Sequence, residues 1–274
     1  YNNFENWGYQ PSFTSDNTPW FFNGLRIQTF PTDRLKVEFW LINGWQSYAK
    51  FNKMPGMGFQ VRYSPKEYIN FVSNGYFGKD AAGLPNRVRW HSDNSFLLRY
   101  YNNPGGKGLN KAAFSITGDL GFENGGGVSP FGDSKTGTPA QNFISAMAYN
   151  RLWFGKHFGW TVGGGFMHNP GRYLVLAPTG DASPIPPVGT HPFSMSPGDK
   201  FDSWDASTTL NYMPSDYITW VAEIVHREAN VPYFAGHGGV TSPDGYTTTP
   251  LTPGWTPDLV KTETRFVLAM IVHF

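Results

Sequence analysis

The sequence predicts an all-β protein, an antiparallel up-and-down transmembrane β-barrel, and three observations support this fold class. Apolar and polar residues alternate with period two over long stretches. Most of these stretches are roughly 9 to 12 residues long, which is the length of a tilted strand that crosses a bilayer. Short and long connections alternate along the chain. Short turns at one end and long loops at the other are the arrangement of an outer-membrane barrel.

Eleven or twelve strands are expected. In the clearest stretch, 111–123, Ile116 and Leu120 fall on one face, and Thr117 and Asp119 fall on the other. The expected strands are 21–30, 34–44, 57–64, 67–77, 92–102, 111–123, 142–154, 158–168, 202–213, 217–228 and 263–274. Only 142–154 is irregular, because its alternation shifts near Tyr149 and Asn150, which indicates a bulge.

Gly, Pro and polar residues mark the connections between these strands. The short turns are expected at 31–34, 64–67, 102–110, 155–157 and 214–216. The long external loops are expected at about 45–56, 78–91, 124–141, 169–201 and 229–262. One of the last two could fold inward as a constriction, or both could stay outside.

The N-terminal end of the chain does not fit a complete barrel. Residues 1–20 are expected to form an external loop or a partial strand. An odd number of strands with an external N-terminus does not suit a bacterial barrel, whose strand number is even. We therefore expect a single barrel domain over 1–274, with an upstream segment that contributes further strands.

Aromatic residues make up 17% of the chain, and many lie near the predicted short turns. They are Phe30, Tyr63, Tyr68, Tyr100, Phe154, Phe158, Trp160, Tyr212, Tyr217 and Phe274. Rings of this kind suit the headgroup level of a membrane, although aromatic residues also favour strands in general. We interpret them as an aromatic girdle.

Composition excludes several classes of protein. The net charge is +1 and 15% of residues are charged, below the usual value of about 25%, which argues against a nucleic-acid partner. The chain has no cysteine, so it has no disulfide, zinc-thiolate site or cysteine nucleophile. No apolar run approaches the length of about 18 residues that a membrane-spanning helix requires.

Catalytic motifs are missing as well. The chain has no H-E-x-x-H, G-x-S-x-G or P-loop motif. The compact candidate is His91, Ser92 and Asp93, which polar residues at the start of a strand explain more simply. Asp181, Asp199 and Asp202 could collect calcium, but they lack EF-hand spacing and a solvated loop explains them more simply. No catalytic residue, cofactor or metal site is therefore expected.

The polar positions of the alternating strands are the candidate pore-lining residues, because successive residues of a barrel strand face lipid and lumen in turn. They are Arg26, Gln28, Lys36, Glu38, Gln60, Arg62, Asn70, Asn74, Arg99, Thr117, Asp119, Glu123, Asp205, Asn211, Glu223, Arg227 and Arg265. Six are basic and five are acidic. This mixture predicts a polar lumen, open or plugged, with weak ion selectivity. Alternatively, the charges pair across strands and only fill the interior.

Several segments resemble a known family. The stretches 21–48, 111–120, 169–176 and 229–236 are similar to the outer-membrane β-barrel porins described as OmpL-like, and the resemblance runs from about residue 20 to the end. It implies a Gram-negative outer-membrane location and a pore. It implies no established substrate and no catalytic residues.

The last strand looks like the signal that the outer-membrane assembly machinery reads. Its apolar residues alternate and end on an aromatic residue: Phe266, Leu268, Met270, Val272 and Phe274. The expected partners are therefore outer-membrane lipid and the assembly machinery, together with a second copy of the chain or another envelope protein.

The leading hypothesis is a porin through which ions and small hydrophilic solutes diffuse passively. The alternative is a closed barrel that anchors envelope partners. A soluble all-β carbohydrate-binding protein is a third hypothesis, which the strand lengths and the alternating connections disfavour. A lipid enzyme at the barrel rim is a fourth, but no nucleophile–base pair can be placed.

Overall fold

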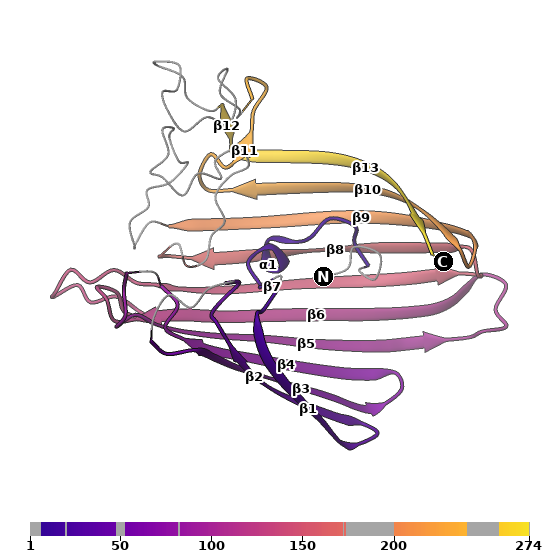
Figure 1. The fold of residues 1–274 in the computed structure, drawn as a ribbon. Coiled ribbons are helices and arrows are strands. Elements are labelled where there is room, and N and C mark those ends of the chain that lie inside the picture. Colours follow the sequence, from indigo (N-terminus) through magenta and orange to yellow (C-terminus); the bar gives the residue numbers. More distant parts are fainter. Residues whose placement is uncertain are drawn as a thin grey trace.

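The structure is a computed structural model that describes residues 7–19, 21–47, 53–81, 83–171, 173, 200–239 and 258–273. Within these ranges, eleven antiparallel strands pair in chain order to form one sheet (Figure 1). They are β1 (Gly24–Thr32), β2 (Leu35–Ile42), β3 (Gly56–Lys66), β4 (Ile69–Gly78), β5 (Val88–Asn102), β6 (Leu109–Asn124), β7 (Asn142–Phe154), β8 (Phe158–Asn169), β9 (Phe201–Ser215), β10 (Ile218–Ala229) and β13 (Thr262–Val272). The all-β, up-and-down fold class is confirmed.

The sheet is a meander with short turns at one end and long loops at the other, as the sequence predicts. Two details differ. β5 begins at Val88 rather than at residue 92, so the preceding loop is shorter than expected. The long connection after β10 contains a small antiparallel pair, β11 (Phe234–Ala235) with β12 (Leu259–Val260). The start of β5 is too polar, and β11 and β12 are too short, for alternation in the sequence to predict them.

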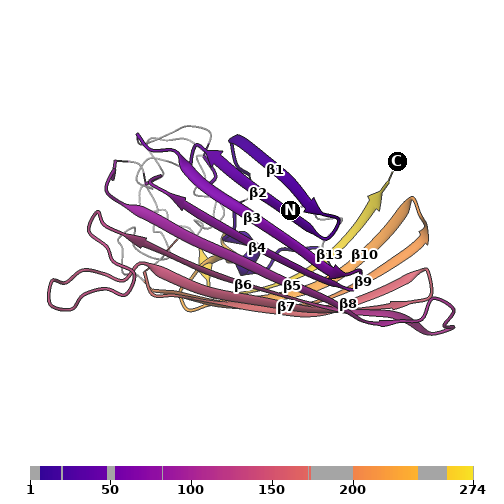
Figure 2. The same ribbon diagram turned by 90° about the horizontal axis from the view of Figure 1, so that it is seen from below.

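The sheet curves into a trough (Figure 2), and β1 and β13 form its two edges without pairing with each other. Residues 7–19, here called the N-terminal segment, lie on the concave face and contain the short helix α1 (Phe13–Asp16). The sequence predicted an external loop or a partial strand here, and the structure differs. No helix in the described ranges is long and apolar enough to cross a membrane.

Polar residues line the concave face and apolar residues cover the convex face. In β9, Asp205, Thr209 and Asn211 are buried, whereas Trp204 and Leu210 are exposed. Exposure on β13 reaches 71% for Leu268. Proteins that stay in water rarely expose an apolar surface of this extent. The alternation that the sequence shows is therefore an inside–outside alternation with the apolar side facing out.

The predicted girdle residues lie on this outer surface. The nine that the structure describes are all exposed: Phe30, Tyr63, Tyr68, Tyr100, Phe154, Phe158, Trp160, Tyr212 and Tyr217. Phe274 lies outside the described residues. Their exposure suits a girdle, and strand register places Tyr63, Phe158, Trp160 and Tyr212 on the convex face.

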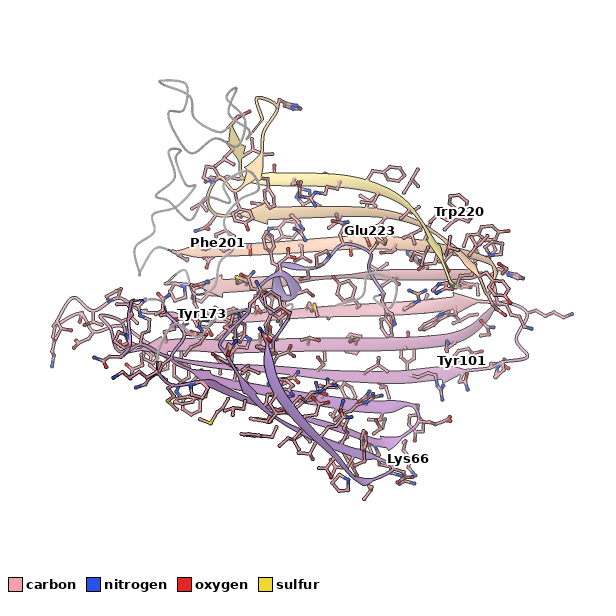
Figure 3. All side chains as sticks on the ribbon, in the orientation of Figure 1. Lys66, Tyr101, Tyr173, Phe201, Trp220 and Glu223 are labelled. Atoms are coloured by element: carbon pink, nitrogen blue, oxygen red, sulfur yellow. The ribbon has the colours of Figure 1, made fainter. Side chains whose placement is uncertain are left out.

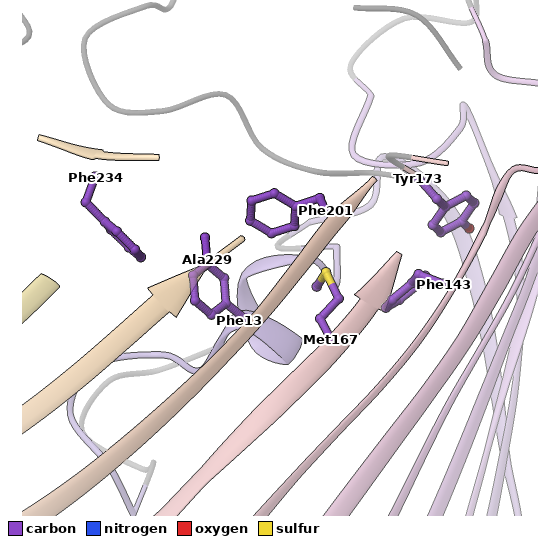
Figure 4. Packing of buried hydrophobic residues seen from close by; sticks show 7 residues of the cluster. All are labelled: Phe13, Phe143, Met167, Tyr173, Phe201, Ala229 and Phe234. Carbon is purple, nitrogen blue, oxygen red and sulfur yellow. The ribbon is translucent and has the colours of Figure 1, made fainter. Parts of the chain in front are cut away.

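The N-terminal segment is held in part by an apolar cluster near the long-loop end (Figure 4). Its buried members are Phe13, Phe143, Met167, Tyr173, Phe201, Ala229 and Phe234. The ring of Phe13 packs against Phe201 with ring centres 6.0 Å apart. The cluster joins α1 to strands β7 to β10, so the segment is packed against the sheet as well as hydrogen-bonded to it.

The prediction of a bulge near Tyr149 and Asn150 is wrong. β7 keeps one register with β8 from Ile144 to Phe154, and with β6 from Asn142 to Trp153. Tyr149 faces the concave side, where it borders a pocket beside the N-terminal segment. Asn150 faces outward and accepts a hydrogen bond of 2.9 Å from Tyr100. The aromatic Tyr149 thus lies on the polar face and the polar Asn150 lies on the apolar face. Each has a contact on its own face, and the register of β7 does not shift.

Candidate functional site: the concave wall

Strand register places all seventeen predicted pore-lining residues on the concave side of the sheet. The buried ones are Glu38, Thr117, Asp119, Glu123, Asp205, Asn211, Glu223 and Arg227. The half-buried or exposed ones are Arg26, Gln28, Lys36, Gln60, Arg62, Asn70, Asn74, Arg99 and Arg265. Their shared position is structural, and a role in permeation stays a prediction.

Five of these residues, together with Asp93 and Ser145, form a continuous line across strands, here called the polar row. Each member faces the next one on the neighbouring strand: Gln28, Glu38, Gln60, Asn74, Asp93, Asp119 and Ser145. Gln60 donates a hydrogen bond of 2.8 Å to Asn74, and Lys36 forms an ion pair of 2.5 Å with Glu38. The Gln60–Asn74 bond joins β3 to β4, and cross-strand pairs of this kind stabilise a sheet.

A second line, here called the aromatic row, lies two residues nearer the long loops. Its members also face one another in order: Trp40, Gly58, Tyr76, His91, Gly121 and Phe143. The two glycines leave space for rings. A Cβ at Gly58 would meet the Trp40 ring at 2.7 Å, and one at Gly121 would meet the Tyr173 ring at 2.5 Å. The absence of side chains there lets the rings lie against the wall.

The N-terminal segment is bound mainly by two buried carboxylates. Glu223, on β10 close to the segment (Figure 3), accepts hydrogen bonds from the backbone N–H groups of Tyr9 at 2.6 Å and Gln10 at 2.7 Å. Asp205 accepts from the Ser12 hydroxyl and from the Phe13 N–H, each at 2.8 Å. Hydrogen bonds to ionised acceptors are the strong ones, so these contacts fix the segment's position.

Arginine side chains complete this docking site. Arg227 pairs with Asp16 at 3.2 Å, donates to the Pro11 carbonyl and lies 5.2 Å from the centre of the Phe13 ring. Burial raises the pKa of Asp16 to about 6, and the Arg227 guanidinium opposes this rise. Arg265 donates to the Gln10 side chain at 3.2 Å.

A second charged cluster lies near the long-loop ends of β5 and β6. Arg89 pairs with Glu123 at 2.7 Å and with Asp80 at 3.1 Å. Tyr76 donates to the same Asp80 carboxylate at 2.8 Å. The strand prediction missed Arg89, because polar and aromatic residues at 88–91 resemble a loop. Counting alternate residues back from Asp93 could have found it.

The compact catalytic candidate does not assemble. His91 and Asp93 face the concave side, whereas Ser92 faces outward and accepts a hydrogen bond of 2.9 Å from Asn94. His91 lies 3.8 Å from Asp119, whose two carboxylate oxygens have no hydrogen-bond partner among the described residues. A nucleophile and a base on opposite faces cannot act together.

Metal-ligating side chains are scattered over the described part of the sheet and its loops. The described part of the chain contains no group of three or more His, Asp or Glu side chains that could hold a metal ion. Asp181 and Asp199 lie outside the described residues. Asp202, which follows them, is engaged by His168 at 2.9 Å and by Lys200 at 2.5 Å.

Long antiparallel strands in a meander, with an apolar outer face and a polar inner face, define a β-barrel protein of the porin class. The chain belongs to the family described as "Putative beta-barrel porin-2, OmpL-like", whose pattern matches residues 1–274. The resemblance found in the sequence is thereby confirmed. No curated protein sequence matches the chain.

One solved structure similar to the chain is the "Copper transporter OprC", with a TM-score of 0.33 and 12% sequence identity. The match covers 89% of this chain and 36% of that chain. This chain thus spans about a third of the length of its structural relative. The class assignment rests on the family and on the sheet.

Proposed function

We propose that this protein is an outer-membrane porin of a Gram-negative envelope, through which ions and small hydrophilic solutes diffuse passively. The observation that carries the proposal is the buried polar wall on the concave side of a sheet whose convex side is apolar. An apolar outer face suits lipid, and a polar inner face suits water. The transport step requires no catalytic residue and no cofactor.

Weak ion selectivity is part of the proposal. Several charges on the concave face occur as pairs of opposite sign: Lys36 with Glu38, Arg89 with Glu123, and Arg227 with Asp16. No ring of one sign occurs among the described residues of this face, and such a ring would favour one sign of ion. We therefore expect a small preference at most.

The N-terminal segment is the proposed constriction. It occupies the concave face along β7 to β10, where its backbone is bound by Glu223 and Asp205. The sequence pointed to the loops at 169–201 and 229–262 instead, and most of their residues lie outside the described ranges. Permeation would then pass between the segment and the opposite wall.

The direct test is single-channel recording of the purified protein in a planar bilayer under a salt gradient. Stable conductance steps with a small reversal potential support the proposal. The double variant Glu223→Gln, Asp205→Asn should loosen the segment and raise the conductance. Glu228→Gln is the matched control, because this residue lies on the same strand and faces outward.

A closed barrel that anchors envelope partners is the second candidate function. It is favoured by the number of bonds that hold the N-terminal segment on the concave face. If it is correct, the wild-type protein inserts into the bilayer without conductance steps. A second copy of the chain or another envelope protein would then be the partner to identify.

The last strand is proposed as the segment that the outer-membrane assembly machinery binds. Phe266, Leu268, Met270 and Val272 alternate along β13 and point outward, with exposed fractions of 65%, 71%, 52% and 45%. This strand is an edge of the sheet, so its outer side offers unpaired backbone groups together with apolar side chains.

A further inference from the structure

A pocket of about 230 Å³ opens on the concave wall between β2 to β5 and the end of the N-terminal segment. Its apolar walls come from Trp40, Trp45 and Tyr76, and its polar wall comes from Gln60, Asn74 and Asp93. Thr18 and Pro19 of the N-terminal segment close one side. The pocket lies where the aromatic row and the polar row run next to each other.

The spacing of the two rows suits a small ring-shaped ligand. Residues two apart on a strand are about 6.6 Å apart, so each polar side chain lies one ring width from an aromatic one. Asn74 precedes Tyr76 and Asp93 follows His91 in this way. A ligand between the rows would meet an aromatic face on one side and hydrogen-bonding groups along its edge.

The aromatic side of the pocket is fixed in position. The Trp40 indole N–H donates a hydrogen bond of 2.8 Å to Glu38, which is itself paired with Lys36. Phe22 stacks on Tyr76 with an interplanar angle of 9°, and Trp45 packs edge-on against the same Tyr76 ring with centres 5.2 Å apart. The rings therefore form a preorganised wall, which lowers the entropic cost of binding.

The polar side can both donate and accept hydrogen bonds. The amide of Gln60 donates to Asn74, and the side chain of Asn74 bonds in turn to Asp93. Both amides retain further donor and acceptor capacity for a ligand. Chains of amides and carboxylates of this kind suit hydroxyl groups, which donate and accept at the same time.

We propose that this pocket binds a neutral sugar ring. A pyranose has apolar C–H faces and a rim of hydroxyl groups, which matches an aromatic wall beside a polar one. A cationic ligand fits less well, because the Arg89 guanidinium already lies 5.7 Å from the centre of the Trp45 ring. An anionic ligand would face the carboxylate of Asp93 in the pocket wall. The proposal rests on the proposed function for access, since the sugar would reach the pocket through the lumen.

The test is a titration of the full chain in detergent with D-glucose, in which saturation-transfer NMR measures the binding. We expect saturable binding in the millimolar range. Trp40→Ala should weaken it about tenfold or more, because it removes an aromatic face from the site. Trp220→Ala is the matched control, because Trp220 is 50% exposed on the convex face near a short turn (Figure 3) and should leave binding unchanged.

A second variant tests the pocket even if Trp40→Ala does not fold. Asn74→Ala removes a polar contact and keeps every ring, so it should fold and still weaken glucose binding several-fold. Choline and gluconate serve as cationic and anionic probes of similar size. The proposal is overturned if glucose does not bind, if Trp40→Ala and Asn74→Ala bind it as the wild type does, or if choline binds more tightly.

The binding assay and the conductance assay separate the two proposals. Conductance steps without glucose binding would overturn the sugar site and leave the porin function standing. Glucose binding without conductance steps would support the site and contradict passive diffusion. Binding that reduces the single-channel current in wild type, and not in Asn74→Ala, would support both.

Discussion

The concave wall has two halves that use the same kind of side chain differently. Along β7 to β10, buried carboxylates bind another part of the chain: Glu223 and Asp205 accept backbone N–H groups from the N-terminal segment. Along β2 to β5, polar side chains bond to one another, as Gln60 does to Asn74, and a pocket stays open beside them.

The difference shows that a polar inner wall does not by itself make an open lumen. A buried carboxylate without a partner is costly, so it binds whatever donors come within reach. Where the N-terminal segment supplies N–H groups, the wall is covered. Where neighbouring strands supply amides, as in the pair of Gln60 and Asn74, the wall stays uncovered and a solute can approach. One half is a docking site and the other is a candidate binding surface.

The largest expected effect comes from a change that disrupts both halves together. Leu268→Arg places a charge on the apolar convex face, where the Leu268 side chain is 71% exposed. At bilayer depth this costs about 2–4 kcal/mol, so we expect impaired folding, measured by denaturant unfolding in lipid. Arg265→Ala, on the concave side of the same strand, should fold normally and change only ion preference. The opposite pair of results would contradict the assignment of the two faces.

The next largest effect should distinguish the halves. Glu223→Ala removes an acceptor that binds Tyr9, Gln10 and Thr209. Hydrogen bonds to charged groups contribute about 1.5–3 kcal/mol each, so the N-terminal segment should detach and single-channel conductance should rise. Gln60→Ala, in the other half, should leave conductance close to wild type. Equal effects of the two variants would remove the distinction between docking wall and open wall.

A smaller effect is expected from filling the space beside an aromatic ring. Gly58→Ala adds a Cβ that would meet the Trp40 ring at 2.7 Å and the Gly75 carbonyl oxygen at 2.9 Å. Overpacking of this kind costs about 1–3 kcal/mol, and the shifted ring should weaken glucose binding. Thermal unfolding and the NMR titration measure the two effects separately. Gly118→Ala is the control, since its nearest contact is at 3.9 Å, and a loss of binding there would show that the effect is not specific to Trp40.

The smallest expected effect is a pH dependence confined to the docking half. Burial raises the pKa of Asp16 from 3.8 to about 6 when the segment is docked, against the opposing charge of Arg227. A raised pKa means that the docked state binds the proton more tightly, so its contribution to docking is fully present below about pH 4 and is lost as pH rises through about 6. Conductance should therefore increase from pH 5 to pH 7. The change should be smaller in Asp16→Asn, with Asp205, Arg227 and Arg265 as the remaining charges nearby. If the conductance of Asp16→Asn changes with pH as much as that of the wild type, other groups cause the pH dependence.

Much of the fold could be predicted because β-strands of this kind carry a local signal. The strand predicted at 142–154 is β7 itself, and the one at 158–168 differs from β8 by one residue. The prediction failed where a side chain has a tertiary reason to break the pattern. Tyr149 is turned inward beside the N-terminal segment, and Arg89 is turned inward to pair with Glu123. The partners of both side chains lie far away in the sequence, so the local pattern does not show the contacts.

The sequence by itself determined most of the eleven paired strands, their order and the face on which the predicted pore-lining residues lie. These properties follow from alternation with period two, which any few consecutive residues display. Only the tertiary structure decided that the N-terminal segment lies inside and which polar groups it binds. The hydrogen bond from Tyr9 to Glu223 joins residues 214 positions apart. Contacts over such separations depend on the curvature of the whole sheet, and a local pattern does not encode them.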